Sequence, residues 1–306
     1  MHALVTGGAG FIGANLCRRF LDEGHSVAVI DDFSTGSPAN LEGLDVDLHE
    51  ATILDSGPLQ RAARGAEAIV HLAAIPSVPR SVKAPLPSHE ANATGTLLVL
   101  EAARETGAHV TVASSSSVYG ANPELPKRET MTPRPRSPYA VSKLAAESYA
   151  IAWGMTYGMP TLAFRFFNVF GPLQAAGHAY AAVIPAFVDA ALAGRPLPIQ
   201  GDGLQTRDFT FVDSVTDLLS RAATQRVSSD VPVNLAFGSR RSLLDVIAEI
   251  EGVLGRPLER EFLSPRVGDV RDSQADNSHL HALFPDVEPF PFEEGLGRTI
   301  EWMATK

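Results

Sequence analysis

The sequence predicts an α/β fold: a doubly wound parallel sheet joined to a smaller, irregular α/β domain. Short apolar runs rich in β-branched residues alternate with helical stretches through the first half of the chain. This β-α-β-α order is typical of a parallel sheet with helices on both faces. After about Gly171 the alternation stops and prolines become frequent. We therefore expect two domains, residues 1–170 and residues 171–306.

The elements of the first domain follow one another along the chain. Strands are expected at residues 3–6, 26–30, 68–71, 109–113 and 161–165. Helices are expected at residues 13–23, 92–106 and 138–157, where apolar residues recur at spacings of three and four. The second domain has two clear helical patterns, residues 181–193 and 242–254, and Ser242 is a plausible N-cap of the second.

Composition and charge describe an ordinary globular chain. Its 306 residues are 45% hydrophobic and 20% charged, which excludes disordered, collagen-like and coiled-coil classes. The 25 Lys and Arg residues stand against 35 Asp and Glu residues, a net charge of −10 without a basic block, so no nucleic-acid partner is expected. No run of 18 apolar residues exists, so no membrane span is expected.

The cysteine and histidine content argues against disulfides, a cysteine nucleophile and a metal site. Cys17 is the single cysteine and cannot form an internal disulfide, which fits a reducing cytosol and a cytoplasmic location. It shares a helical pattern with Leu16 and Phe20, which favours buried packing over a nucleophilic role. The nine histidines show no metal-ligand spacing, so no metal is expected.

A glycine-rich loop connects the first expected strand to the first expected helix. Gly7 permits a tight turn, Gly10 allows the backbone to approach a pyrophosphate, and Gly13 lets the helix pack close to the strand. The N–H groups and dipole at the helix start, around Phe11 and Ile12, then face the phosphates. Strand, loop and helix in this order predict a Rossmann dinucleotide site made by Gly7, Gly10, Phe11, Ile12 and Gly13.

Two carboxylates end the second expected strand. Asp31 lies 18 residues after Gly13, where a carboxylate can accept hydrogen bonds from the adenosine ribose hydroxyls and would repel a 2′-phosphate. No Arg immediately follows Asp31 and Asp32 to favour NADP. The alternative is that both carboxylates belong to a solvated turn. The predicted cofactor is NAD.

A tyrosine and a lysine predict proton-transfer chemistry. Tyr139 and Lys143 lie four residues apart in a helical segment, so their side chains project from one face. An ammonium near a phenol is expected to lower the phenol pKa toward neutrality, and the same ammonium can hold the nicotinamide ribose. Upstream, serines 114–117 follow a strand at the sheet edge where parallel sheets bind ligands.

Together these motifs resemble those of the extended short-chain dehydrogenase/reductases, in particular the NAD-dependent epimerase/dehydratase family, and most closely the bacterial UDP-hexose 4-epimerases. The resemblance extends over nearly the whole chain. It rests on TGGAGFIG (6–13), SSSSVYG (114–120), SPYAVSK (137–143), RFFNVFGP (165–172), YAAVIP (180–185), GDGLQTRDFTFV (201–212) and RVGDVRDSQAD (266–276). It implies that residues 1–170 bind NAD and carry the catalytic residues, and that residues 171–306 bind the UDP-sugar.

The resemblance also implies roles for individual residues. Ser115 matches the catalytic Ser/Thr, although Ser116 could supply the main hydroxyl, and Asn168 matches a contact to the diphosphate. Arg207 and Arg266 match arginines that grip the diphosphate, which suits the bidentate geometry of arginine, although Arg207 could instead pair with a surface carboxylate. The substrate-binding residues implied are Arg80, Ser115, Ser116, Tyr139, Asn168, Val183, Arg207, Arg266, Asp269 (for the uridine ribose) and Ser273 (near the sugar ring).

The expected reaction is 4-epimerisation of a UDP-hexose. Tyr139 takes the proton of the sugar 4-hydroxyl, Ser115 shares that hydrogen bond, and NAD oxidises C4 to a transient 4-keto sugar. Dehydratases of the family carry an Asp-Glu pair where this chain has Ser116 and Ser117, so elimination lacks its usual acid and base. The alternatives are a UDP-glucuronate 4-epimerase, a nucleotide-sugar dehydratase or another NAD-dependent oxidoreductase, or a binding protein that kept the fold.

Substrate choice and assembly are left open by the residues. Ser273 is small at a place that is aromatic in epimerases restricted to UDP-glucose and UDP-galactose, so the pocket is open to N-acetyl or uronic acid sugars. Leu173 and Pro76 replace basic residues of many relatives. By resemblance, helices 92–106 and 138–157 would form a four-helix interface in a homodimer.

Overall fold

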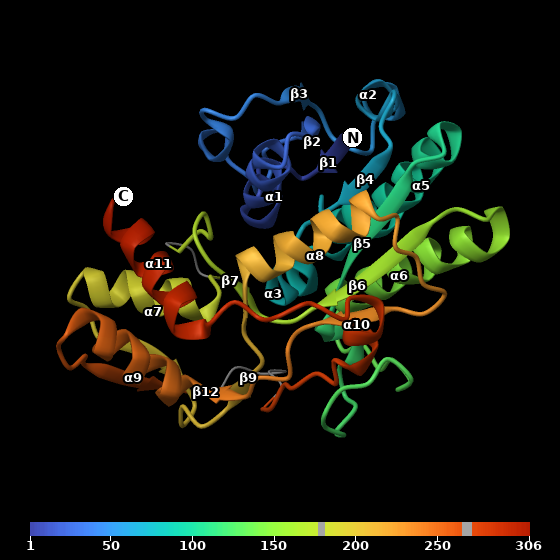
Figure 1. Ribbon diagram of the computed structural model, residues 1–306. Coiled ribbons are helices and arrows are strands. Elements are labelled where there is room, and N and C mark those ends of the chain that lie inside the picture. Colours follow the sequence, from blue (N-terminus) through green and yellow to red (C-terminus); the bar gives the residue numbers. More distant parts are fainter. Residues whose placement is uncertain (177–180, 265–270) are drawn as a thin grey trace.

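Seven parallel strands form the central sheet of the computed structural model, which describes residues 1–176, 181–264 and 271–306 (Figure 1). The strand order is β11-β6-β5-β4-β1-β2-β3. The strands are β1 His2–Thr6, β2 Ser26–Asp31, β3 Asp47–Glu50, β4 Ala68–His71, β5 His109–Ser115, β6 Thr161–Phe166 and β11 Val233–Leu235. The predicted doubly wound α/β class is confirmed, and β3 and β11 are additions to the five strands that the sequence predicts.

Helices cover both faces of the sheet because successive strand residues point to opposite sides. In β1, Val5 packs against α1 (Phe11–Asp22) and α8 (Val212–Thr224), whereas its neighbour Leu4 packs on the other face. That second face is covered by α2 (Ser56–Ala63), α5 (Gly95–Thr106) and α6 (Pro138–Tyr157). Two buried layers therefore enclose a sheet of nearly continuous apolar runs.

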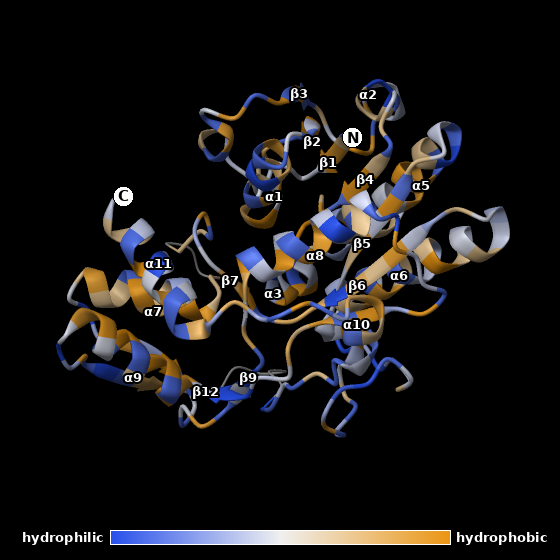
Figure 2. Ribbon diagram, in the orientation of Figure 1, coloured by the Kyte–Doolittle hydropathy of each residue, from blue (hydrophilic) through white to orange (hydrophobic). Residues whose placement is uncertain are grey.

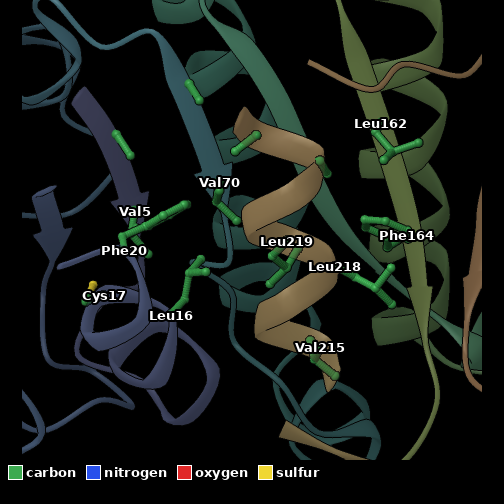
Figure 3. Packing of buried hydrophobic residues seen from close by; sticks show 14 of the residues in the cluster. Val5, Leu16, Cys17, Phe20, Val70, Leu162, Phe164, Val215, Leu218 and Leu219 are labelled. Carbon is green, nitrogen blue, oxygen red and sulfur yellow. The ribbon is translucent and has the colours of Figure 1, made fainter. Parts of the chain in front are cut away.

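Helix α8 is an element that the sequence reasoning does not anticipate. Its apolar residues recur at three and four spacing and lie between α1 and β6, where Leu218 and Leu219 are fully buried (Figure 3). Hydrophilic and hydrophobic residues alternate along the helix (Figure 2). Both α8 and β11 come after residue 170 yet belong to the central sheet and its cover, and the division of the chain at residue 170 stays a prediction.

The helix that carries Tyr139 and Lys143 has the predicted bounds. Pro138 is its first residue, and the Ser137 hydroxyl accepts a hydrogen bond from Ala140 N at 3.1 Å. Both features favour a helix start at this point, because the proline ring presets φ and the serine caps a free N–H. The position of Tyr139 in the first turn of α6, and of Lys143 one turn later, is thus encoded locally.

The expected helix 92–106 has a different beginning. A π-helical turn, Glu90–Thr94, precedes α5. On this turn the buried Asn92 accepts a hydrogen bond from Ile75 N at 2.8 Å and donates one to Ser142 Oγ at 3.0 Å. It therefore ties the loop after β4 to α6.

A smaller unit lies at the lower left of Figure 1, beside the sheet. Helices α7 (Val183–Leu192), α9 (Leu243–Leu254) and α11 (Phe292–Ala304) enclose a third apolar cluster with β8 (Leu197–Gln200), which pairs with β13 (Arg260–Leu263). Ser242 caps α9 as predicted, in a capping box with Asp245. The remaining short elements are α3 Val78–Lys83, α4 Pro85–His89, α10 Ser278–Leu283, the paired β7 Val169–Phe170 and β10 Thr210–Phe211, the paired β9 Thr206–Arg207 and β12 Arg241–Ser242, and 3-10 turns Pro38–Leu41 and Ser116–Tyr119.

Cys17 lies in the core, where the packing interpretation places it. The thiol is fully buried in α1, and burial raises its pKa to about 12, so it is not a thiolate at neutral pH. Among the residues that the structure describes, no helix is long and apolar enough to cross a membrane, and no cluster of three potential metal ligands occurs.

Candidate active site

The first large cavity lies where the chain reverses direction across the sheet. After β1 the chain proceeds to β2 and β3 on one side, then returns to β4 on the other side of β1. Ligands of open parallel sheets bind in the crevice at such a switch point, outside the carboxyl ends of the strands. The cavity there has a volume of about 540 Å³, and its walls include Gly7, Gly10, Phe11, Ile12, Gly13, Asp31, Asp32, Thr52, Ala73, Ser115, Tyr139, Lys143, Gln174 and Ala182.

The glycine loop has the geometry of a phosphate cradle. Gly7 has φ +71°, and a Cβ there would lie 2.7 Å from Ala73 N. A Cβ at Gly13 would lie only 2.2 Å from Gly7 O, so the loop and the start of α1 approach as closely as backbones can. The first intrahelical hydrogen bond of α1 runs from Ala14 N to Gly10 O, so the three N–H groups before it point past the helix end. These residues fit a dinucleotide pyrophosphate.

The two carboxylates after β2 are placed at the same cavity. Asp31 accepts hydrogen bonds from Ala9 N at 2.9 Å and Phe33 N at 2.8 Å, and burial is the main cause that raises its pKa. Because Asp31 is buried, it is not part of a solvated turn. Asp32 accepts from Ser34 N at 2.9 Å. A ribose with free hydroxyls suits such acceptors, and a further phosphate would meet like charge.

The structure brings Ser115, Tyr139 and Lys143 together in the wall of the first cavity. Ser115 ends β5, and the other two lie on α6 one turn apart. Lys143 Nζ donates to Ala113 O at 2.8 Å, and burial lowers the Lys143 pKa to about 8. The expected lowering of the Tyr139 pKa is not found: burial raises it, and a hydrogen bond with Ser115 only opposes that effect.

A second cavity of about 460 Å³ adjoins the first. Gln174 and Ala182 line both, so the two meet at these residues. Asn168 and Arg207 lie in the wall of the second cavity, and Val183 at the start of α7 lines it as well. The helix N-terminus adds free N–H groups and a positive dipole end to this wall. An anionic group in this cavity would therefore have three kinds of donor around it.

Hydrogen bonds hold the Asn168 and Arg207 side chains of the second cavity in place. Asn168 Nδ2 donates to Asp208 O at 3.0 Å. Arg207 Nη1 donates to the carbonyl oxygens of Thr206 at 2.9 Å and Arg271 at 3.0 Å. The Asp208 carboxylate is itself fully buried and accepts from Ala275 N, and burial raises its pKa to about 6. Backbone contacts thus preset the direction of the guanidinium.

Strained backbone marks the junction of the two cavities. Ser77 has φ +110° and Asn168 has φ +25°, and both line the second cavity. Leu173, next to the shared Gln174, has φ +72°. Non-glycine residues in the left-handed region cost free energy and tend to gather at functional sites. Their position agrees with a ligand site at the junction.

Several residues that the sequence predicts for the substrate do not reach these walls. Ser116 and Ser273 are outside both described linings, and so is the exposed Arg80 on α3. Arg266 and Asp269 lie outside the described residues. Conversely, the shared residues Gln174 and Ala182 are missed by sequence reasoning, because no motif separates them from an ordinary loop. Their importance comes from the folded arrangement alone.

Comparisons with known proteins identify the family. The family model described as NAD dependent epimerase/dehydratase matches residues 3–236. The UDP-glucose 4-epimerase of Mycolicibacterium smegmatis is 38% identical, covering 100% of this chain and 99% of that protein. Among solved structures, the UDP-N-acetylglucosamine 4-epimerase of Methanobrevibacter ruminantium in complex with UDP-N-acetylmuramic acid has a TM-score of 0.94 and 34% identity, covering 99% of this chain and 98% of that chain.

A third similar protein was solved with its cofactor. The UDP-glucuronic acid 4-epimerase of Bacillus cereus, in complex with UDP-glucuronic acid and NAD, has a TM-score of 0.89 and 29% identity, covering 100% of this chain and 99% of that chain. The family match spans most of the chain, and the relatives are similar over their whole length. The resemblance seen in the motifs is thereby confirmed, and the chain belongs to the NAD-dependent epimerase/dehydratase family.

Proposed function

We propose that the protein is an NAD-dependent UDP-sugar 4-epimerase, an isomerase that works through a transient 4-keto sugar. One observation carries the proposal: the cavity lined by Ser115, Tyr139 and Lys143 adjoins a second cavity lined by Asn168 and Arg207. A sugar held by its diphosphate in the second cavity would lie toward the phenol in the first. The 4-epimerases among the similar proteins support the same reaction.

The residues of the first cavity would handle the proton of the sugar 4-hydroxyl. When bound, NAD supplies the reversible oxidation of C4. Tyr139 Oη accepts the hydroxyl proton and later returns it, and Ser115, in the same cavity wall, stabilises the oxygen during the transfer. Lys143 is fixed on Ala113 O, where its ammonium favours the phenolate of Tyr139. Gly7, Gly10, Gly13 and Asp31 would hold the cofactor.

The second cavity would hold the nucleotide while the keto sugar turns. Epimerisation needs a tight nucleotide anchor and loose contacts to the sugar, so that C4 can present its other face. Asn168, Arg207 and the start of α7 at Val183 can bind the diphosphate. Small side chains leave space for rotation near the junction: Ala182 lines both cavities, and Ala175 lines the first.

A UDP-glucuronate 4-epimerase is the second candidate, because one similar structure holds UDP-glucuronic acid. A dehydratase is less well supported, since Ser116 and Ser117 stand where elimination would need an acid and a base. Tests with separate substrates distinguish these functions. The protein is incubated with UDP-glucose, UDP-N-acetylglucosamine and UDP-glucuronate, and product mass, product identity and nicotinamide absorbance are followed.

The expected result is a product of unchanged mass that is the C4 epimer, without net reduced cofactor. A product lighter by water or carbon dioxide would contradict the proposal, as would stoichiometric formation of reduced cofactor. The substrate with the highest kcat/KM identifies the sugar. A cytoplasmic location stays a prediction that rests on the single cysteine.

The pH dependence of the reaction should reflect Lys143. Burial lowers its pKa to about 8, so the ammonium is present below that pH and is lost as the pH rises through it. Because Tyr139 depends on that charge, we expect kcat/KM to fall above about pH 8. Initial rates from about pH 6 to about pH 10, with thermal unfolding followed at each pH, check this. A constant kcat/KM up to the upper end would contradict the assignment.

We also propose that the protein forms a homodimer through α5 and α6. Val141, Tyr149 and Tyr157 on α6 are large apolar or aromatic residues with exposed side chains. Exposed apolar surface gathered on one element is typical of an interface. Light scattering should give the mass of two chains for the wild type and of one chain for Val141→Asp. Phe262→Asp, at an equally exposed site on β13, should stay dimeric.

A further inference from the structure

A buried ion pair lies behind the catalytic residues, outside both described cavity linings. Arg165 on β6 contacts Glu147 on α6 through two hydrogen bonds, Nη2 to Oε1 at 2.6 Å and Nε to Oε2 at 2.9 Å. The side chains are 2% and 3% exposed. Placing both charges in the core costs desolvation, so the pair is a poor source of stability compared with apolar residues of the same size. Its contacts with the residues around Ser115 explain better why the pair is buried here.

The pair holds the residue immediately before Ser115. Ser114 Oγ, also buried, donates to Glu147 Oε2 at 2.7 Å. One turn earlier on α6, Lys143 Nζ donates to Ala113 O at 2.8 Å. Two successive residues at the end of β5 are thus attached to two successive turns of α6.

The pair also contacts the turn immediately after Ser115. The Arg165 guanidinium lies over the ring of Tyr119, with Cζ 4.7 Å from the ring centroid. Tyr119 ends the 3-10 turn Ser116–Tyr119, and its hydroxyl donates to Asn234 Oδ1 at 2.6 Å on β11. Ser115 is therefore flanked on both sides by residues that contact the same ion pair.

We propose that Glu147 and Arg165 are positioning residues for the reaction: they fix the end of β5, with Ser115, against the helix that carries Tyr139. This inference rests on the proposed function. Ser115 and Tyr139 line the same cavity but belong to two different elements, so the distance between their hydroxyls depends on how β5 and α6 are held together. Displacements of about 1 Å at a reacting group can cost as much as a hundredfold in rate, and rigid support of the reacting groups prevents them.

The test removes the hydrogen bond between Glu147 and Ser114, a residue that also lines the first cavity, so cofactor affinity is measured as well. Ser114→Ala leaves Glu147 and Arg165 paired, whereas replacing Glu147 would leave a buried guanidinium without its partner and would test folding instead. Ser220→Ala on α8 is the matched control, since Ser220 is equally buried and its hydroxyl donates to Glu23, a carboxylate that also pairs with an arginine.

We expect Ser114→Ala to lower kcat about tenfold, with KM, UDP affinity and NAD affinity within about twofold of wild type. Ser220→Ala should lower the melting temperature by a similar amount and leave kcat unchanged. Equal kcat in the two variants would overturn the positioning role, and so would a loss confined to KM or to cofactor binding. Absence of epimerisation in the wild type would instead refute the proposed function, so the two failures are distinguishable.

Discussion

Replacing Tyr139 with phenylalanine is expected to lower kcat for epimerisation about a thousandfold, the usual range for loss of a general acid–base group. The phenol lies in the wall of the first cavity with Ser115, and no other side chain with a phenol lines that cavity among the described residues. Phenylalanine keeps the ring and its packing. The affinity for UDP should therefore stay within about twofold, because the nucleotide would bind in the second cavity.

Tyr157→Phe is the matched control for this variant. Tyr157 is the last residue of the same helix and its side chain is exposed, so loss of its hydroxyl should leave kcat unchanged. Turnover is measured as formation of the C4 epimer, and UDP binding by calorimetry. If the Tyr139 variant turned over at a near-normal rate, another group would have to be the base.

The sequence predicts the first half of the fold well because its signals there are local. Proline and serine at the start of α6 and the glycines after β1 each determine backbone conformation within a few residues. Two of the elements that the sequence analysis misses, β11 and α8, are missed for different reasons. Strand β11 has three residues, Val233–Leu235, and becomes a strand only by pairing with β6 across a large sequence separation. Helix α8 has a clear apolar period, but the prolines around it favour an irregular interpretation.

In the candidate site, too, locally encoded features can be predicted from the sequence and features that depend on distant packing cannot. The glycines, Asp31, Ser115, Tyr139 and Lys143 of the first cavity come from contiguous motifs, so their identity and spacing can be predicted from the sequence. The meeting of the two cavities at Gln174 and Ala182 depends on how distant segments pack, and no local pattern contains it. The Tyr139 pKa is a similar case. Spacing shows that Lys143 is near, but only the folded structure shows that burial of the phenol has the larger effect.

Gly13→Ala is expected to lower NAD affinity at least about a hundredfold and the free energy of unfolding by about 3 kcal/mol, the upper range for overpacking. The new Cβ would lie 2.2 Å from Gly7 O and 2.7 Å from Gly8 Cα. Both are backbone atoms, so no side chain can rotate away, and the loop must separate from α1. That movement would displace the N–H groups at the helix start from the pyrophosphate position.

Gly297→Ala is the control that separates this clash from the ordinary effect of alanine in a helix. Gly297 lies within α11, and a Cβ there would meet nothing within 4 Å. Alanine has the higher helix propensity, so this variant should gain about 0.5 to 1 kcal/mol with unchanged NAD affinity. Calorimetric NAD titration and urea unfolding of both variants provide the comparison. If Gly13→Ala lowers the free energy of unfolding and Gly297→Ala raises it, the contact with Gly7, rather than helix preference, requires glycine at residue 13. If both variants are stabilised and bind NAD normally, the glycine loop is not the phosphate cradle.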